Sequence, residues 1–266
     1  ATMNTTLKSL SAHTDGQHLL IGIGAPLVSV LGGHIPDLRE FPHELRMGNT
    51  QPAAALWCWL RGDERGELWQ RGHELTALLQ SAFTLRQSVD GFTHRGGHDL
   101  TGYEDGTENP KGNAAVAAAI VGKTAPEGLH GSSFVAVQQW SHQWATFNAM
   151  SKAEQDNAIG RERVSNDELE DAPESAHVKR TAQESFEPEA FVVRRSMPWT
   201  NGDEGGLMFT SFGHNLDGFE AQWRRMLGLD DGIKDALFQF SEPMTHDYFW
   251  CPPMVEGHLD LRALGL

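Results

Sequence analysis

The pattern of apolar and turn-forming positions in the first half of the chain predicts a mixture of helices and strands. Apolar, β-branched runs bounded by Gly, Pro or polar residues are typical of strands, and they occur at 19–31, 53–60 and 83–89. Apolar positions recur at helical spacing over 66–80, and a short helix is predicted over 5–12. The first half therefore combines three predicted strands with two predicted helices.

The second half repeats this kind of pattern after a break. The Gly-rich, polar stretch 91–112 is too irregular for a helix or strand, and the Ala- and Gly-rich stretch 112–130 predicts a connector with a short helix. Ser151 and Glu154 have the spacing of a capping box, and 219–227 has the apolar spacing of an amphipathic helix. Strands are predicted at 133–140, 191–198, 207–212 and 248–250.

Both halves thus predict strands with helices on one face, which is an α+β fold of two similar sandwiches packed together. We expect an N-terminal domain at 1–112, a connector at 113–130 and a C-terminal domain at 131–266. The second half opens with a strand, whereas the first opens with a helix. If the halves are equivalent, the first domain has lost its opening strand or the sequence has been shortened.

Composition narrows the classes of partner and compartment. The 266 residues are 39% hydrophobic and carry a formal charge of −15, which disfavours nucleic acid and anionic membrane surfaces as partners. The only cysteines, Cys58 and Cys251, are too few for a disulfide framework. No signal peptide and no apolar run of membrane-spanning length is visible. We therefore expect a cytoplasmic protein that binds neither nucleic acid nor membranes.

The stretch 102–110, Gly-Tyr-Glu-Asp-Gly-Thr-Glu-Asn-Pro, is the most unusual local sequence. On local composition alone it is more typical of a surface turn, because turn formers dominate it. The alternative is a tight loop that presents Asp105 to a cleft, where a partly desolvated carboxylate can act as an acid or base.

Other candidate groups have equally plain alternatives. His177 is one of 13 histidines, most of which are expected to be surface or packed residues, although imidazole is a frequent ligand of metals and haem iron. Arg194 and Arg195 are neighbours in a predicted strand, so only one of them can point into a given cleft. His94 and His98 have no third zinc ligand at diagnostic spacing. No nucleophile elbow, Walker loop or dinucleotide-binding loop is present.

Taken together, these stretches resemble the dye-decolourising haem peroxidase family. The stretch 102–110 is similar to its Gly-x-x-Asp-Gly motif, and 159–161, 177–180 and 193–198 follow in the family's order and at similar spacing. The resemblance covers 19–253 and implies a pair of ferredoxin-like domains with antiparallel sheets. The family's first strand is missing from the N-terminal domain. The motifs are most similar to the bacterial cytoplasmic, class B-like branch.

The resemblance implies roles for individual residues. His177 matches the proximal ligand of the haem iron, and Asp105 and Arg194 match the distal pair that acts on peroxide. Five further positions match residues around the haem: Arg161 near the propionates, Ser196 on the distal side, Leu207 and Phe209 in the distal pocket wall, and Asp235 as the acceptor of a hydrogen bond from the proximal His.

The function that the resemblance implies is a peroxidase with haem b as its cofactor. It would reduce hydrogen peroxide and oxidise dyes, phenolics or other small reductants, and it would assemble as a homo-oligomer. Two alternatives use the same pocket: a non-enzymatic haem store or carrier, and a deferrochelatase-like enzyme that removes iron from porphyrin. Neither needs the Asp105–Arg194 pair, which is why a peroxidase is the preferred hypothesis.

Overall fold

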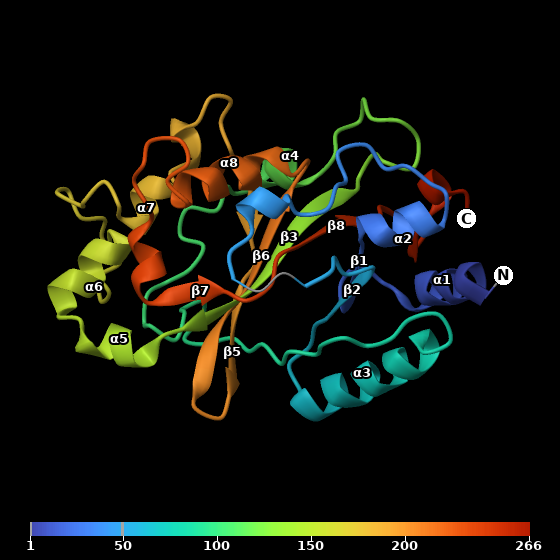
Figure 1. The fold of residues 1–266 in the computed structure, drawn as a ribbon. Coiled ribbons are helices and arrows are strands. Elements are labelled where there is room, and N and C mark those ends of the chain that lie inside the picture. The colour runs from blue at the N-terminus through green and yellow to red at the C-terminus, as the bar shows by residue number, and fades with distance from the viewer. Residues whose placement is uncertain (1, 49–50) are drawn as a thin grey trace.

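One antiparallel sheet runs through the computed structural model, which describes residues 2–48 and 51–266 (Figure 1). In spatial order its main strands are β2 (Leu56–Leu60), β1 (Leu19–Ile23), β8 (Asp247–Cys251), β3 (Ser133–His142), β6 (Glu204–Gly213) and β4 (Val193–Arg194). Two further strands pair with these: β5 (Met197–Asn201) with β6, and β7 (Ser241–Pro243) with β3. A separate small pair is formed by β9 (Met254–Val255) and β10 (His258–Leu259).

Strand β8 connects the sequence halves within this sheet. On one side it pairs with β3 over several residues, for example Phe134 with Trp250. On the other side it reaches β1, which pairs in turn with β2, through the single register pair Ile23–Trp250. Trp250 is fully buried, so the junction lies inside the protein core. The antiparallel pair of β1 and β2 is thus an extension of the sheet of the second half.

In the view of Figure 1, helices lie above the sheet, below it and at its left and right ends. Both chain ends lie near α1 and α2, where Ser11 Oγ donates to Leu259 O at 3.0 Å. The helices are α1 (Thr2–His13), α2 (Ala25–Val30), α3 (Arg65–Leu79), α4 (Asn113–Ala119), α5 (Trp144–Ala149), α6 (Lys152–Ile159), α7 (His177–Arg180) and α8 (Asp217–Met226), with short 3₁₀ helices at His43–Leu45, Gln183–Ser185, Ala236–Gln239 and Arg262–Leu264. Among the described residues, no helix is both long and apolar enough to cross a membrane.

Alternation along the central strands decides which side chains can form a site. Side chains of a strand point alternately to the two faces of the sheet. On β3, Phe134, Ala136 and Trp140 join the core that contains Phe219 and Trp223 of α8. The odd-numbered neighbours Val135 and Val137 belong instead to a cluster on the other face, with Phe249, Trp57 and Phe212. The face covered by α8 is the one that carries the cavity described below.

The α+β class is confirmed, and most predicted elements are present. The amphipathic helix at 219–227 is α8, and α6 begins with the predicted capping box of Ser151 and Glu154. The predicted strand 19–31 is wrong beyond Ile23, because Pro26 lies in the first turn of α2 and starts a helix there.

Two other predicted strands differ from the structure. The stretch 83–89 lies wholly within the described chain and forms no strand, and Leu85 is 61% exposed, so its apolar run marks no sheet position. The stretch 191–198 is divided into β4 and β5 by Arg195 and Ser196. Both parts pair with β6 in one register, since Arg194 faces Ser211 and Met197 faces Met208.

Candidate functional site

A cavity opens between the α8 side of the sheet and the loops and short helices of the second half. It encloses about 900 Å³ of space, including the part that is open to solvent. Its apolar wall consists of Trp140, Ile159, Leu207, Phe209, Phe219, Trp223, Met226, Leu237 and Phe240. Of the predicted site residues, those that line it are Asp105, His177, Arg194, Leu207 and Phe209.

His177 is the first residue of α7, and a buried carboxylate fixes its ring. Its Nδ1 lies 2.8 Å from Oδ2 of Asp235, whose side chain is 0% exposed. Asp235 is itself held by Leu237 N, which donates to Oδ1 at 2.8 Å. Because a carboxylate accepts hydrogen bonds, Nδ1 carries the proton and Nε2 keeps its lone pair. This is the arrangement of a metal-ligating His whose other nitrogen is anchored by an acidic residue.

The loop that carries Asp105 is shaped by glycines on both sides. Gly102 and Gly106 have φ values of 91° and 77°, in the left-handed region that favours glycine. Asp105 N donates to Gly97 O at 2.9 Å, which fixes the carboxylate-bearing residue against the preceding loop. The stretch 102–110 is a turn-rich loop of which Tyr103, Glu104 and Asp105 line the cavity, so it is not only a surface turn.

Asn109 fastens this loop to strand β4. Its Oδ1 accepts from Arg194 N at 2.8 Å, and its Nδ2 donates to Arg194 O at 2.9 Å. Both backbone groups of Arg194 are thereby paired with one amide side chain. The sequence analysis gave Asn109 no role, although it belongs to the motif. The only signal for it was its place in that motif.

Arg194 and Asp105 both line the cavity, but their side chains do not form a hydrogen bond with each other. The distance from Arg194 Nε to Asp105 Oδ1 is 3.9 Å, which is longer than a hydrogen bond. Arg194 Nε is buried and has no hydrogen-bond partner among the described residues. The neighbouring Arg195 is exposed. A buried guanidinium nitrogen without a partner is costly, so the geometry favours a small polar or anionic ligand between the two side chains.

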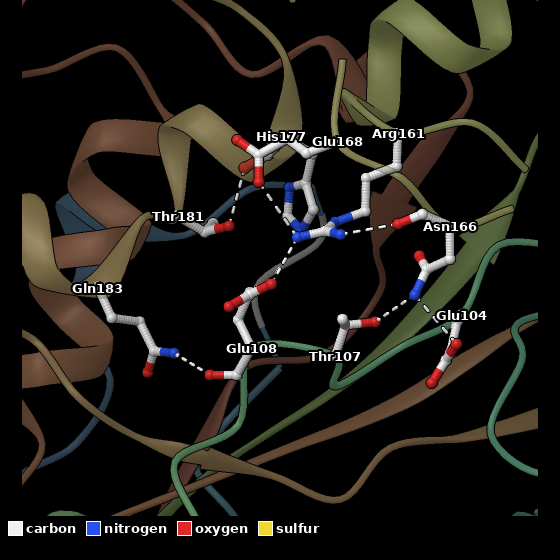
Figure 2. A network of polar contacts seen from close by, with 9 residues as sticks. All are labelled: Glu104, Thr107, Glu108, Arg161, Asn166, Glu168, His177, Thr181 and Gln183. Carbon is white, nitrogen blue, oxygen red and sulfur yellow. Dashed lines mark hydrogen bonds and ion pairs between the residues drawn. The ribbon is translucent and has the colours of Figure 1, made fainter. Parts of the chain in front are cut away.

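Arg161 lies in a polar network next to the cavity residue Ile159. Its guanidinium contacts Glu108 at 2.5 Å and Glu168 at 3.2 Å, and it donates to Asn166 O at 2.9 Å (Figure 2). Arg161 is only 8% exposed, whereas the two carboxylate side chains are 64% and 57% exposed. The cation is thus fixed, and its acidic partners have freedom to turn toward solvent.

Three predicted residues are not among the described residues that line the cavity. Asp235 lies behind His177, and Arg161 lies in the network just described. Ser196 joins β4 to β5, and its buried Oγ finds no hydrogen-bond partner in the described chain. All of the predicted residues other than Ser196 therefore either face the cavity or belong to a polar contact described above.

The cavity is also lined by three buried side chains that hydrogen-bond to one another and that the sequence analysis missed: Asp99, His142 and Ser241. His142 contacts Ser241 Oγ at 2.8 Å through Nδ1 and Asp99 Oδ1 at 3.0 Å through Nε2. Burial alone would raise the pKa of Asp99, but hydrogen bonds from His142 and Thr101 outweigh burial and hold that pKa below its ordinary value. These residues are far apart in sequence, so no local motif revealed them.

A second buried histidine, His246, contacts one of the residues that line the cavity. His246 Nδ1 lies 2.8 Å from Nε2 of Gln138, a cavity residue on β3. Burial lowers the pKa of His246 to about 4, with a further contribution from nearby Arg46, against a hydrogen bond to Met47 that raises it. The ring is therefore neutral above mildly acidic pH.

Comparison with known proteins agrees with this arrangement. Residues 97–256 match the family model of the C-terminal part of Dyp-type peroxidases. This chain belongs to the Dyp-type peroxidase family. The matched segment contains Asp105, His177 and Arg194, and the resemblance inferred from the motifs is therefore confirmed.

Relatives extend the similarity to most of this Dyp-type chain. A dye-decolorizing peroxidase of Mycolicibacterium paratuberculosis is 30% identical over 212 residues, which are 77% of this chain and 60% of that protein. The Mycobacterium tuberculosis dye-decolorizing peroxidase is 32% identical over 224 residues, covering 81% of this chain and 67% of that protein. The chain therefore spans only about 60% of the length of the first of these relatives.

A solved structure shares the fold as well. A DypB variant from Rhodococcus jostii in complex with heme is 26% identical and superimposes with a TM-score of 0.80. The match covers 94% of this chain and 84% of that one. The antiparallel α+β architecture described above is thus the architecture of Dyp-type peroxidases.

Proposed function

We propose that this chain is a haem peroxidase that reduces hydrogen peroxide and oxidises dyes, phenolics or other small reductants. One observation carries the proposal: a single cavity is lined by His177, backed by Asp235, and by the Asp105–Arg194 pair. A haem carrier or an enzyme that removes iron needs a ligand for the iron but has no use for the acid and cation together.

The residues of the cavity fit haem b, iron protoporphyrin IX. His177 offers Nε2 to iron, and the apolar wall suits the porphyrin ring. The partnerless Nε of Arg194 leaves a polar position in the cavity for an iron-bound ligand. Arg161, whose acidic partners are exposed, is suited to hold a haem propionate. That DypB was solved in complex with heme gives the same fold a precedent for this cofactor.

In the proposed reaction Asp105 moves the proton. Bound haem supplies the iron centre that binds peroxide and takes up its oxidising equivalents. The Asp105 carboxylate takes the proton from the near peroxide oxygen and returns it to the departing oxygen, directly or through a water. An oxygen that lies beside the 3.9 Å line from Asp105 Oδ1 to Arg194 Nε would be within hydrogen-bond distance of both atoms.

Arg194 stabilises charge in the same step. Its guanidinium is already desolvated and lacks a partner at Nε, so it can donate to the oxygen on which negative charge builds as the O–O bond breaks. On the other side, Asp235 accepts a hydrogen bond from His177 Nδ1 and thereby raises the basicity of Nε2. We also propose that the protein is a cytoplasmic homo-oligomer whose chain divides into domains at 1–112 and 131–266.

The test is a visible absorption spectrum of the haem-reconstituted chain, before and after one equivalent of hydrogen peroxide. The wild-type haem band should shift within seconds, and His177→Ala should lose the band, whereas the exposed-residue control His34→Ala should behave like the wild type. Asp105→Asn and Arg194→Leu should keep the band but shift it at least ten times more slowly. A haem band that loses intensity with peroxide but does not shift to a new position would instead indicate a haem carrier.

A further inference from the structure

The proposed peroxidase reaction needs protons in its second stage, after the O–O bond has broken. In the first stage Asp105 only moves a proton from one peroxide oxygen to the other, so both protons of hydrogen peroxide leave in the first water. The oxygen that stays behind leaves as the second water only after it has taken up two electrons and two further protons. These protons must reach a cavity whose wall is largely apolar. A buried group that can donate a proton there would therefore serve the second stage alone.

Such a group lies at the end of β3. His142 is 8% exposed and lines the cavity together with Asp99 and Ser241. Its Nε2 lies 3.0 Å from Asp99 Oδ1, and its Nδ1 lies 2.8 Å from Ser241 Oγ. Because both ring nitrogens have a polar partner, the ring is held in one orientation, with Nε2 directed to the carboxylate and Nδ1 to the serine hydroxyl. The mechanism described above gives none of these three residues a role.

The carboxylate of Asp99 determines which ring nitrogen can exchange a proton. Burial acts to raise the pKa of Asp99, but hydrogen bonds from His142 and Thr101 outweigh burial and keep that pKa below its ordinary value, so the carboxylate is ionised at neutral pH. An ionised carboxylate only accepts hydrogen bonds, so Nε2 of His142 keeps its proton and Nδ1 is the nitrogen that gains and loses one. The other close neighbours of the ring, Ser241 and Trp144, carry no charge that would oppose Asp99. Asp99 therefore stabilises the ring when both of its nitrogens are protonated.

Ser241 connects Nδ1 of His142 to the cavity. Its side chain lines the cavity and is 1% exposed. A hydroxyl can accept a hydrogen bond and donate one at the same time, so it can take up one proton while it gives away another. The contact from Ser241 Oγ to Ser141 O is long, at 3.5 Å, so the hydroxyl can turn its proton towards the cavity. The pair of His142 and Ser241 therefore has the parts of a proton donor that faces the cavity.

We propose that His142 is the proton donor of the second stage and that it acts through the hydroxyl of Ser241. The inference rests on the proposed peroxidase function. The Nδ1 proton of the doubly protonated ring passes to Ser241 Oγ, while that hydroxyl gives its own proton to the remaining oxygen, directly or through a water. The ring then regains a proton from solvent at Nδ1 by the reverse route. Two such transfers, together with two electrons from the reductant, complete the second water.

Stopped-flow absorbance of the haem-loaded chain separates the two stages, because peroxide starts the first and saturating ferrocyanide drives the second. Ferrocyanide gives one electron and carries no proton, so it cannot supply the protons itself. His142→Gln keeps a hydrogen-bonding side chain that cannot ionise. This variant should shift the haem band with peroxide at the wild-type rate, but the band should return with ferrocyanide at least tenfold more slowly. The control His214→Gln, at an exposed histidine that contacts Ala118 O, should match the wild type in both stages.

Ser241→Ala should show the same selective loss in the second stage. Its matched control is Ser132→Ala, because Ser132 is also 1% exposed but is not among the described residues that line the cavity. A wild-type rate of band return in His142→Gln overturns the proposal. Equal slowing of both stages also overturns it, because that would show a structural role around Asp105. If the haem band of the wild type does not respond to peroxide at all, the proposed peroxidase function has failed instead.

Nuclear magnetic resonance gives a second test that involves no turnover. In the diamagnetic ferrous carbon monoxide form, with isotope-labelled histidine, the ring of His142 is identified by the signals that His142→Gln removes. As the pH is varied, Nδ1 should gain and lose its proton while Nε2, which faces Asp99, keeps its own. A ring whose Nδ1 never changes protonation would rule out His142 as the donor.

Discussion

The side chain of Asn109 holds both backbone groups of Arg194, with hydrogen bonds of 2.8 and 2.9 Å. It thereby joins the loop that carries Asp105 to the strand that carries Arg194. The separation of 3.9 Å between the two functional side chains thus depends on a residue that touches neither of their charged groups. Asn109 is a positioning residue in the proposed mechanism.

Replacing Asn109 by Ala should slow the reaction with peroxide while leaving the cofactor bound. Two hydrogen bonds disappear, the Arg194 backbone is left without those partners, and the Asp105–Arg194 distance is no longer fixed. Stopped-flow absorbance should show at least a tenfold lower rate of the peroxide-induced band shift, with an unchanged haem band beforehand. Asn148→Ala, an exposed site on α5, is the control. An unchanged rate in Asn109→Ala would show that the loop is held by other contacts.

Gly106→Ala should damage the same loop through its backbone. Gly106 has a φ of 77°, and an added Cβ would meet Asn109 Nδ2 at 2.8 Å. Strain in the left-handed region costs on the order of 1–3 kcal/mol, and the contact pushes Asn109 away from Arg194. Chemical denaturation should report the loss of stability, and the rate with peroxide should fall as in Asn109→Ala. The control is Gly202→Ala. Gly202 has a φ of 59°, and an added Cβ would meet nothing within 4 Å, so this variant has the backbone strain without the contact with Asn109.

Asp235→Ala should weaken haem binding rather than the chemistry at Asp105. The carboxylate fixes the His177 ring at 2.8 Å, and loss of such a partner lowers affinity for a ligated metal about 10- to 100-fold. Haem titration of the apoprotein measures this change directly. Asp230→Ala, which breaks a surface contact of 3.8 Å to Arg224, should leave the affinity as it is. Undiminished affinity in Asp235→Ala would argue against His177 as the iron ligand.

Acid should destabilise the fold through His246. Its pKa is lowered from 6.5 to about 4 in the folded chain, so between these values the unfolded chain binds a proton that the folded chain does not. Stability therefore falls as the pH drops from about 6.5 to about 4, by roughly 3 kcal/mol at about 1.4 kcal/mol per pKa unit. Thermal unfolding across this range should show a shallower pH dependence for His246→Gln than for the wild type or His34→Gln. Parallel curves would assign the acid sensitivity to other groups.

The sequence predicted elements well where periodicity and local chemistry agreed. The apolar spacing of α8 and the capping box of α6 each fix a helix without help from the rest of the chain. The stretch 83–89 failed because an apolar run does not reveal whether another strand lies beside it. The run 19–31 failed because one Pro changes a strand into a helix within three residues of Ile23.

The candidate site could be predicted only as far as its motifs reach. Asp105 and His177 lie in distinctive local sequences, which allowed the family resemblance to identify them. The hydrogen-bonded side chains of Asp99, His142 and Ser241 have no such signal, because they meet only after the sheet has formed. Pairing across strands, rather than spacing along the sequence, decides which polar groups share a cavity.

The position of β8 has a consequence for how the molecule is made. Its residues 247–251 are synthesised after every other strand of the main sheet, yet they lie between β1 and β3. The antiparallel pair of β1 and β2 leaves the ribosome early and cannot join the rest of the sheet until β8 has been synthesised. The edge of β1 that pairs with β8 is therefore unpaired through most of translation. We expect nascent chains stalled before Asp247 to depend on chaperones, and chains released after Cys251 to complete the sheet rapidly.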